Sequence, residues 1–437
     1  MELNYKKNKN ENLFKKMCDP ELLDLENIQN YIPLYNVFFD LNESNYNNIN
    51  LNNKYRLTDV NEKKSYSKFN CIINDNSDNA CNKEVFFKYS PLVDPIKYMI
   101  GKYELSYNIF NLPKLNKEEN TLEKVLDPNN SAYSDGFFYY LSSLLLTNYN
   151  FINGINYYGS FISNKNNFIV NIEDDIEYLD DSDFFHKNNN ILFKITNNNN
   201  NNLFSNTKKN RTKIELSNLD EDFDIDIVDS IIDITYNNSI ENNTSKLELT
   251  YTNVEKNNNE DNNEESKLKN NKKQKTNENN NTKSSCSSRY SNTESVNSES
   301  NNDDESNETS SIESDSSNEE DIFMSINKFP VQVICLECCE NTLDDYISNN
   351  KIKDNEWESI VLQILFTLIT YQKVFDFTHN DLHTNNIVYN SSEKKFIYYK
   401  FNNKHYKIPT FGKIYKIIDF GRAIYKFKGK QIISDSY

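Results

Sequence analysis

The stretch FTHNDLHTNNIVYN (residues 377–390) and the stretch IYKIIDFG (residues 414–421) decide the fold predicted for this chain. In the first, His379 is followed by Asp381 and then Asn386, between an apolar helical segment and an apolar strand. The second is a buried-strand pattern that ends in Asp419, a phenylalanine and a glycine. Asparagine is abundant in this sequence, so each residue alone is weak evidence. Their order along the chain is far more specific.

The segments around these stretches predict one long helix and an extended hairpin. Residues 355–375 carry apolar side chains at helical spacing and predict the longest amphipathic helix. Residues 391–416 alternate apolar and polar side chains around a turn at Asn402 and Asn403, which predicts a β-hairpin. The predicted core stripe of the long helix comprises Ile360, Val361, Ile364, Leu365, Leu368 and Ile369.

Upstream, the sequence predicts a β-rich part that contains one clear helix. Residues 84–90 and 329–339 read as buried strands, and residues 131–149 read as a helix. Ser131 or Ser134 is its expected N-cap. Its expected apolar face comprises Phe138, Leu141, Leu144 and Leu145.

Composition predicts that the chain is not ordered throughout. It has 437 residues, a formal net charge of −18 and 36% apolar residues, and its mean hydropathy is −0.82. Residues 196–321 are dominated by Asn, Ser, Glu, Asp and Lys, and such a segment cannot bury enough apolar surface to offset its chain entropy. We therefore expect a disordered insert there. Its alternating patch at 222–236 fits a strand, a docking segment or an apolar part of that disordered insert. Its acidic serine-rich run at 310–321 fits a spacer or a set of phosphoacceptors.

Charge and cysteine usage limit the expected partners and compartment. The acidic balance, without a concentrated basic face, argues against nucleic acid as a partner. No stretch is apolar enough for a membrane span, and the N-terminus lacks a signal core. The seven cysteines form no paired framework, which is typical of a reducing, intracellular setting. We expect a cytoplasmic location, in a host cell or virion if the protein is viral.

The ordered set H-x-D-L-x-x-x-N followed by D-F-G resembles the catalytic core of the protein-kinase superfamily, most closely over residues 377–430. The pattern HNDLH, the long hairpin and the Asn-rich insert are similar to serine/threonine kinases of giant DNA viruses of amoebae, and DLH also occurs in haspin-like kinases. The resemblance implies an α+β bilobal fold. Residues 1–195 and 322–340 would form a β-rich small lobe that includes the strand and hinge, and residues 341–437 an incomplete helical large lobe.

The resemblance also implies roles for four residues of the motif. Asp381 would accept or orient the proton of the attacking hydroxyl, and His379 would brace the loop. Asn386 and Asp419 would hold Mg²⁺, since hard cations prefer such oxygen ligands. The implied reaction transfers a phosphoryl group from ATP to a serine or threonine hydroxyl of a protein substrate.

Outside the motif, the resemblance assigns a phosphate-pairing lysine and a hinge. Lys88 in VFFK stands where the family places the lysine that pairs with phosphates, although a lysine ending an apolar strand also fits a surface residue. Its acidic partner is expected to be Asp135 or Glu104. The adenine edge would meet the backbone near Glu337, Cys338 and Cys339. A zinc site at these cysteines is disfavoured, because the sequence offers no second ligand pair nearby.

Four departures from the family pattern leave alternatives open. No glycine precedes Lys88, so the loop over the phosphates lacks its usual residues. Asn380 replaces the arginine of H-R-D, and His383 replaces the lysine common in serine/threonine kinases. Gly421 lies close to the last residue, so large-lobe helices that would cover the long helix are missing. The alternatives are a pseudokinase or gene fragment acting as a binding module, a chain completed by another polypeptide, and a small-molecule phosphotransferase.

Overall fold

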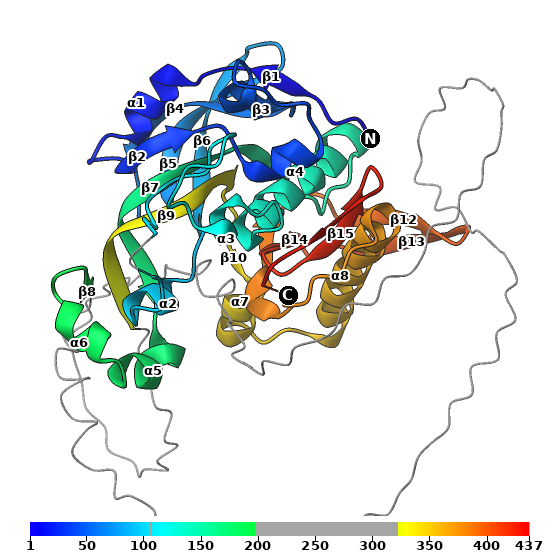
Figure 1. Ribbon diagram of the computed structural model, residues 1–437. Coiled ribbons are helices and arrows are strands. Elements are labelled where there is room, and N and C mark those ends of the chain that lie inside the picture. Colours follow the sequence, from blue (N-terminus) through cyan, green and yellow to red (C-terminus); the bar gives the residue numbers. More distant parts are fainter. Residues whose placement is uncertain (105–106, 197–321, 437) are drawn as a thin grey trace, which may run out of the picture.

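The computed structural model describes residues 1–104, 107–196 and 322–436, in which helices and strands are mixed (Figure 1). The predicted insert, with its patch at 222–236 and its acidic run at 310–321, falls almost entirely outside these described residues. Among the helices that are described, none is long and apolar enough to cross a membrane.

A curled, antiparallel sheet of seven strands makes up most of the N-terminal part (Figure 1). Its order is β2-β7-β9-β6-β5-β4, and β8 pairs with the beginning of β9. Strands distant in sequence therefore become neighbours, most notably β6, β7 and β9. The bounds are β2 (Leu25–Gln29), β4 (Tyr55–Lys63), β5 (Lys68–Asp75), β6 (Ala80–Pro91), β7 (Tyr157–Asn171), β8 (Phe193–Ile195) and β9 (Phe323–Glu337).

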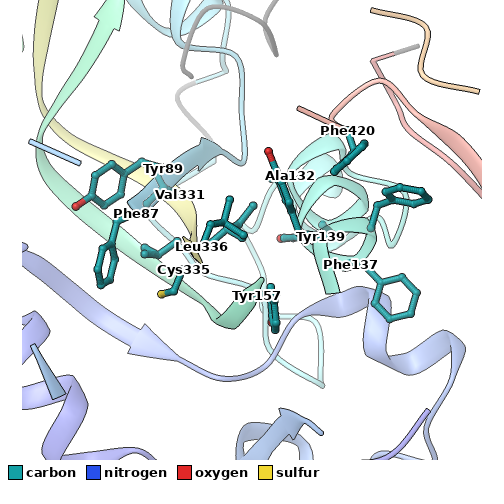
Figure 2. Close-up of a cluster of buried hydrophobic side chains, with 14 of the residues drawn as sticks. Phe87, Tyr89, Ala132, Phe137, Tyr139, Tyr157, Val331, Cys335, Leu336 and Phe420 are labelled. Carbon is teal, nitrogen blue, oxygen red and sulfur yellow. The ribbon is translucent and has the colours of Figure 1, made fainter. Parts of the chain in front are cut away.

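One face of this sheet forms an apolar core because its side chains alternate with period two. Phe87 of β6 packs against Phe69 of β5 with ring centroids 5.0 Å apart, and both rings are fully buried. Figure 2 shows Phe87 and Tyr89 of β6 in the same cluster as Val331 and Cys335 of β9. The intervening residues of β6 therefore face the other side of the sheet.

Helix α4 (Ser131–Tyr149) lies against that other side. Every residue from Ala132 to Leu145 is buried, so the helix has no polar face of the kind expected for a surface helix. The predicted N-caps are wrong: Ser131 and Ser134 lie inside the helix, and the Asn130 side chain accepts from the backbone N–H of Ala132. An asparagine caps as well as a serine does, and this one also donates to the carbonyl oxygens of Leu92 and Lys124.

The C-terminal part combines two helices with short sheets. Asn402 and Asn403 both have positive φ, which confirms the predicted turn of the β12–β13 hairpin. The three-stranded sheet has the order β10-β11-β14, and β15 pairs with β16. The bounds are β10 (Asn341–Thr342), α7 (Leu343–Asn349), α8 (Asp354–Phe375), η7 (Thr384–Asn386), β11 (Ile387–Ser391), β12 (Phe396–Phe401), β13 (Lys404–Pro409), β14 (Lys413–Ile417), β15 (Ile424–Phe427) and β16 (Lys430–Ile433).

Helix α8 buries a different face from the predicted one. Val361 and Leu365 are 48% and 45% exposed, so the predicted stripe is wrong at these two positions. The hairpin and β14 pack on the neighbouring face, where Phe366 stacks on Tyr399 with ring centroids 4.3 Å apart. The buried residues of α8 are Ser359, Ile360, Gln363, Phe366, Thr367, Thr370, Tyr371 and Phe375.

Smaller elements complete the described chain. Strand β1 pairs with β3 beside the N-terminus, and three short helices follow β7 or precede β8 at the far end of the sheet (Figure 1). The bounds are β1 (Tyr5–Lys7), α1 (Glu11–Met17), η1 (Pro33–Val37), η2 (Tyr46–Asn48), β3 (Ile49–Leu51), α2 (Pro95–Met99), α3 (Glu123–Leu126), η3 (Glu173–Asp175), α5 (Ile176–Asp180) and α6 (Asp183–Asn188).

Candidate active site

A buried ion cluster joins three distant segments of the chain. Lys88 alternates with Phe87 and Tyr89 on β6, so its side chain leaves the sheet core and points toward α4. Its Nζ atom lies 2.7 Å from Asp135 Oδ2 and 3.0 Å from Asp419 Oδ1. The side chain of Lys88 is 3% exposed, and the two carboxylates are 2% and 0% exposed. The predicted lysine is therefore a buried, paired residue rather than a surface one.

The cluster contains two acids for one base, and this shifts the pKa values of Lys88 and Asp135. Burial alone would lower the pKa of Lys88, but Asp135 and Asp419 outweigh it and raise that pKa well above its usual value. Burial raises the pKa of Asp135, Lys88 opposes the shift, and the nearby charge of Asp419 adds to it. A second cation beside these carboxylates is favoured, because it would neutralise the excess negative charge.

Helix α4 also fixes the backbone after β14. Asp419 has a left-handed conformation (φ 61°), which aspartate adopts more readily than most residues. Its N–H donates to Tyr139 Oη at 2.8 Å, and the N–H of Phe420 donates to Asp135 Oδ1 at 2.8 Å. Figure 2 shows Phe420 and Tyr139 close together, with ring centroids 4.9 Å apart. The sequence analysis did not predict Tyr139, although its place one helical turn after Asp135 was a signal.

The loop before β11 is hydrogen-bonded to the backbone at the C-terminal end of β14. His379 Nε2 donates to the carbonyl oxygen of Ile418 at 3.0 Å, and burial lowers the pKa of this histidine, so the neutral form is favoured. The N–H of Ile418 donates to the carbonyl oxygen of Asn386 at 3.0 Å. His379, Asn386 and Asp419 are thereby held at one end of β14.

The side chain of Asn386 is oriented by its own donors. Its Nδ2 donates to the carbonyl oxygen of Asp381 at 2.9 Å. It also lies 3.0 Å from Nε2 of His383, which must accept because the amide nitrogen carries only donors. A carbonyl oxygen cannot donate, so the amide cannot be flipped, and Oδ1 faces away from both partners.

Three side-chain oxygens in this region are buried without a hydrogen-bond partner: Asp381 Oδ2, Asn386 Oδ1 and Asp419 Oδ2. Leaving such an acceptor unsatisfied costs about 1–3 kcal/mol, and more when it is charged. They belong to the three residues that the sequence predicted to converge. A carboxylate and an amide oxygen are ligands suited to Mg²⁺, so this set fits a bound magnesium ion.

A positive side chain that the sequence analysis missed lies beside Asp381. Arg422 Nη1 is 3.2 Å from Asp381 Oδ1, so the two oxygens of that carboxylate differ in their surroundings. Asn380, in a left-handed conformation, donates to the carbonyl oxygen of Arg422 at 2.9 Å. The position of Arg422 directly after the D-F-G triplet could have identified it as a residue of this site.

The predicted hinge residues lie apart from this cluster. Glu337 forms an ion pair with the buried Lys416, and its N–H donates to the carbonyl oxygen of Asn156 at 3.0 Å, so that donor is already engaged. A shallow cavity of about 500 Å³ is lined by Glu337, Cys338 and Cys339. Its described lining does not include Lys88 or the three motif residues.

The structure also bears on two alternatives that the sequence left open, the acidic partner of Lys88 and a zinc site at the cysteines. Glu104 is exposed on the surface, whereas Asp135 pairs with Lys88. Cys335 is fully buried in the sheet core, and Cys338 and Cys339 are partly buried. Over the described ranges, no group of three or more His, Cys, Asp or Glu residues is arranged to hold a metal ion.

Comparison with known proteins gives one limited similarity. No protein-family model matches the chain. Over 100 residues the chain is 34% identical to a protein of Dictyostelium discoideum named as a probable serine/threonine-protein kinase. The match covers 21% of this chain and 8% of that protein, so the chain spans a small part of the relative it matches. This similarity supports a relationship to kinases over that segment only.

Proposed function

We propose that this chain is an ATP- and Mg²⁺-dependent phosphotransferase that acts on serine or threonine hydroxyls of protein substrates. The observation that carries the proposal is the set of three unpartnered oxygens, on Asp381, Asn386 and Asp419, beside the buried Lys88–Asp135 pair. Phosphoryl transfer needs positioned oxygens for a metal, a positive group for phosphates and an acceptor for the hydroxyl proton. The similarity to a protein named as a kinase is consistent with this.

The proposal includes a bilobal, protein-kinase-like architecture. Residues 1–195 and 322–340 would form the small lobe and hinge, with residues 196–321 as an insert, and residues 341–437 the large lobe. The curled sheet with α4 on one side and the helices α7 and α8 after β10 support this assignment. The order along the chain of Lys88 on β6, Asp135 on α4 and Asp419 after β14 fits it as well.

Each residue of the cluster would have a distinct role. A bound Mg²⁺ would supply positive charge that offsets the negative charge of the ATP phosphates. Asn386 Oδ1 and Asp419 Oδ2 are the free oxygens suited to hold that ion, and Lys88, kept in place by Asp135, would face the phosphates. The backbone near Glu337, Cys338 and Cys339 would contact adenine. The N–H of Glu337 donates to the carbonyl oxygen of Asn156, so it would not be one of the donors to adenine.

Asp381 would orient the attacking hydroxyl and receive its proton. Arg422 lies beside Oδ1 and leaves Oδ2 without a hydrogen-bond partner. A substrate hydroxyl donating to Oδ2 would satisfy that oxygen. His379, neutral because of its burial, would hold the loop through Ile418 rather than exchange protons.

Phosphate incorporation from labelled ATP into a generic protein substrate tests the role of Asp381. Asp381→Asn should lower the rate by about 10²–10⁴-fold, the usual contribution of a proton acceptor. The matched control is Asp376→Asn, because Asp376 is an exposed carboxylate in a left-handed C-cap where asparagine fits. Undiminished incorporation by purified Asp381→Asn protein would refute the assigned role. Amines and sugars offered beside protein distinguish a small-molecule phosphotransferase.

A second candidate function is a binding module without catalysis. The exposed apolar residues Val361 and Leu365, one turn apart on the same side of α8, favour it, because adjoining exposed apolar side chains are typical of an interaction site. Thermal denaturation with and without ATP and Mg²⁺ separates the two functions. A competent site should gain about 2.7 kcal/mol at a ligand concentration of about 100 Kd, and a pure binding module should gain nothing.

A further inference from the structure

A second cavity lies between the curled sheet and the β1–β3 pair, and its lining does not include Lys88, Asp135 or Asp419. A cavity of about 240 Å³ is enclosed by β1, β3, β4 and β7, which meet where the sheet curls (Figure 1). A water molecule takes about 30 Å³ of liquid volume, so the cavity has room for roughly eight waters. That is the size of a small organic ligand or one modified side chain.

The charge of this cavity is opposite to that of the chain. Lys6, Lys7 and Arg56 line it, and no aspartate or glutamate is among its described lining residues, although the chain has a net charge of −18. One of these groups already has an acidic partner, because Asp78 of the exposed β5–β6 turn pairs with Arg56. Lys6 Nζ donates to Asn76 Oδ1 at 3.2 Å, so a neutral group faces it.

The remaining wall offers neutral polar groups. Asn53 Nδ2 donates to Ser143 Oγ at 2.9 Å and to the carbonyl oxygen of Tyr157 at 2.5 Å. Because that carbonyl can only accept, the amide of Asn53 cannot be flipped. Its Oδ1, and the Oδ1 of the adjacent Asn52, are buried without a hydrogen-bond partner. A ligand carrying a hydroxyl or ammonium group would supply the donors that these oxygens lack.

We propose that this cavity binds a phosphate monoester that also carries a hydrogen-bond donor. Arginine recognises phosphate through two parallel N–H bonds, and lysine contributes a compact charge, so the basic side chains suit a dianionic phosphate. The partner is small or a single phosphorylated side chain, because the enclosed volume excludes a polymer. Neither the residues nor the ligand is part of the proposed phosphotransfer site, so this inference stands independently of it.

Binding of O-phospho-L-serine to the full chain, measured by calorimetry with L-serine as the uncharged comparison, tests the proposal. Lys7→Gln and Arg56→Gln should each weaken binding about ten- to a hundredfold, the loss expected for one charged hydrogen bond. Lys9→Gln is the matched control, because Lys9 is an exposed lysine on the same segment, as Lys7 is, but is not part of the lining. Asp78→Asn should strengthen binding, since it frees Arg56.

A phosphoserine peptide and free glycerol phosphate, used as further probes, distinguish a phosphorylated side chain from a small phosphate ester. Binding of either that responds to Lys7→Gln supports the site. The proposal is overturned if phosphoserine binds no better than serine, or if Lys7→Gln and Lys9→Gln weaken binding equally. Circular dichroism of each variant shows whether it is folded, and Lys7→Gln remains informative if Arg56→Gln unfolds, because it does not break the Arg56–Asp78 ion pair.

Discussion

Replacing Lys88 with methionine removes the cation that lies between the buried carboxylates of Asp135 and Asp419. The methionine has a similar length and fills the space, so packing changes little. What remains is a pair of carboxylates that are 2% and 0% exposed, both within contact distance of the lost Nζ. Breaking a buried ion pair by removing one partner costs about 3–5 kcal/mol. The melting temperature should fall by roughly 6–20 °C, at about 2–4 °C per kcal/mol.

Removing Asp135 instead should have a much smaller effect. Burial raises the pKa of Asp135, which means that its ionised form is less favourable in the folded protein than in water. Asp135→Asn deletes that charge, leaves Lys88 paired with Asp419, and keeps an acceptor for the N–H of Phe420. We expect an unfolding free energy within about 1 kcal/mol of the wild type at pH 7, the worth of a typical hydrogen bond.

The pH dependence has a definite sign. A carboxyl whose folded pKa is raised contributes stability that is present below its ordinary pKa of 3.8 and is lost as pH rises through the raised value. The wild type should therefore lose its advantage over Asp135→Asn as pH increases across that window. The raised pKa of Lys88 contributes stability at all pH values below its ordinary pKa of 10.5, so the cost of Lys88→Met should persist at neutral pH.

Urea denaturation, followed through the fluorescence of Trp357, the single tryptophan, measures these free energies. The double variant Lys88→Met with Asp135→Asn provides the sharpest comparison. Because it removes one of two repelling carboxylates, it should be more stable than Lys88→Met alone, with a coupling of about 0.5–3 kcal/mol. If the second substitution lowers stability further, the charges are not coupled as described, and the electrostatic reasoning is wrong.

Three other tests address further parts of the fold, each by urea denaturation. Lys165 is buried, and burial lowers its pKa to about 8. The wild-type free energy of unfolding should therefore rise between about pH 8 and 10.5, as this lysine loses its proton in the unfolded chain too. Lys165→Met should be more stable than the wild type by up to about 3 kcal/mol at pH 7, and this difference should vanish by about pH 10.5. Ile360→Ala should cost about 2–5 kcal/mol because Ile360 is fully buried, and Leu365→Ala, at an exposed position of the same helix, less than about 1 kcal/mol. Asn130→Ala should cost about 1–3 kcal/mol and Ser131→Ala little, since Asn130 is the cap; equal effects within either pair would contradict the assigned burial or cap.

The motif residues could be proposed from the sequence because the pattern that singles them out is local. Asp381 and Asn386 are five positions apart, and Asp419 follows an apolar strand, so short-range patterns were enough to propose them as site residues. The partner of Lys88 was narrowed only to Asp135 or Glu104. Choosing between them required knowing that α4 packs against the face of the sheet from which Lys88 projects. That packing depends on contacts between segments that are distant in the sequence.

Helix α8 illustrates why periodicity alone misplaced the buried face. The prediction assumed that apolar residues face inward, yet Thr367 and Thr370 are buried while Leu365 is exposed. Each threonine hydroxyl donates to the carbonyl oxygen one turn earlier, at 2.8 and 2.7 Å, so it is satisfied within the helix. A threonine paired in this way can occupy the interior, and hydropathy does not record that pairing.

The ion cluster is an unfavourable arrangement for a protein that needed only to be stable. Replacing a buried ion pair with well-packed apolar residues is often neutral or stabilising, yet this fold keeps Lys88, Asp135 and Asp419 together with unpartnered oxygens on Asn386 and Asp381. Each of those oxygens costs free energy in the unliganded chain. A bound cation would remove the excess negative charge and satisfy the free acceptors at the same time. The energetic disadvantage of the cluster is therefore itself an argument for the proposed metal and nucleotide site.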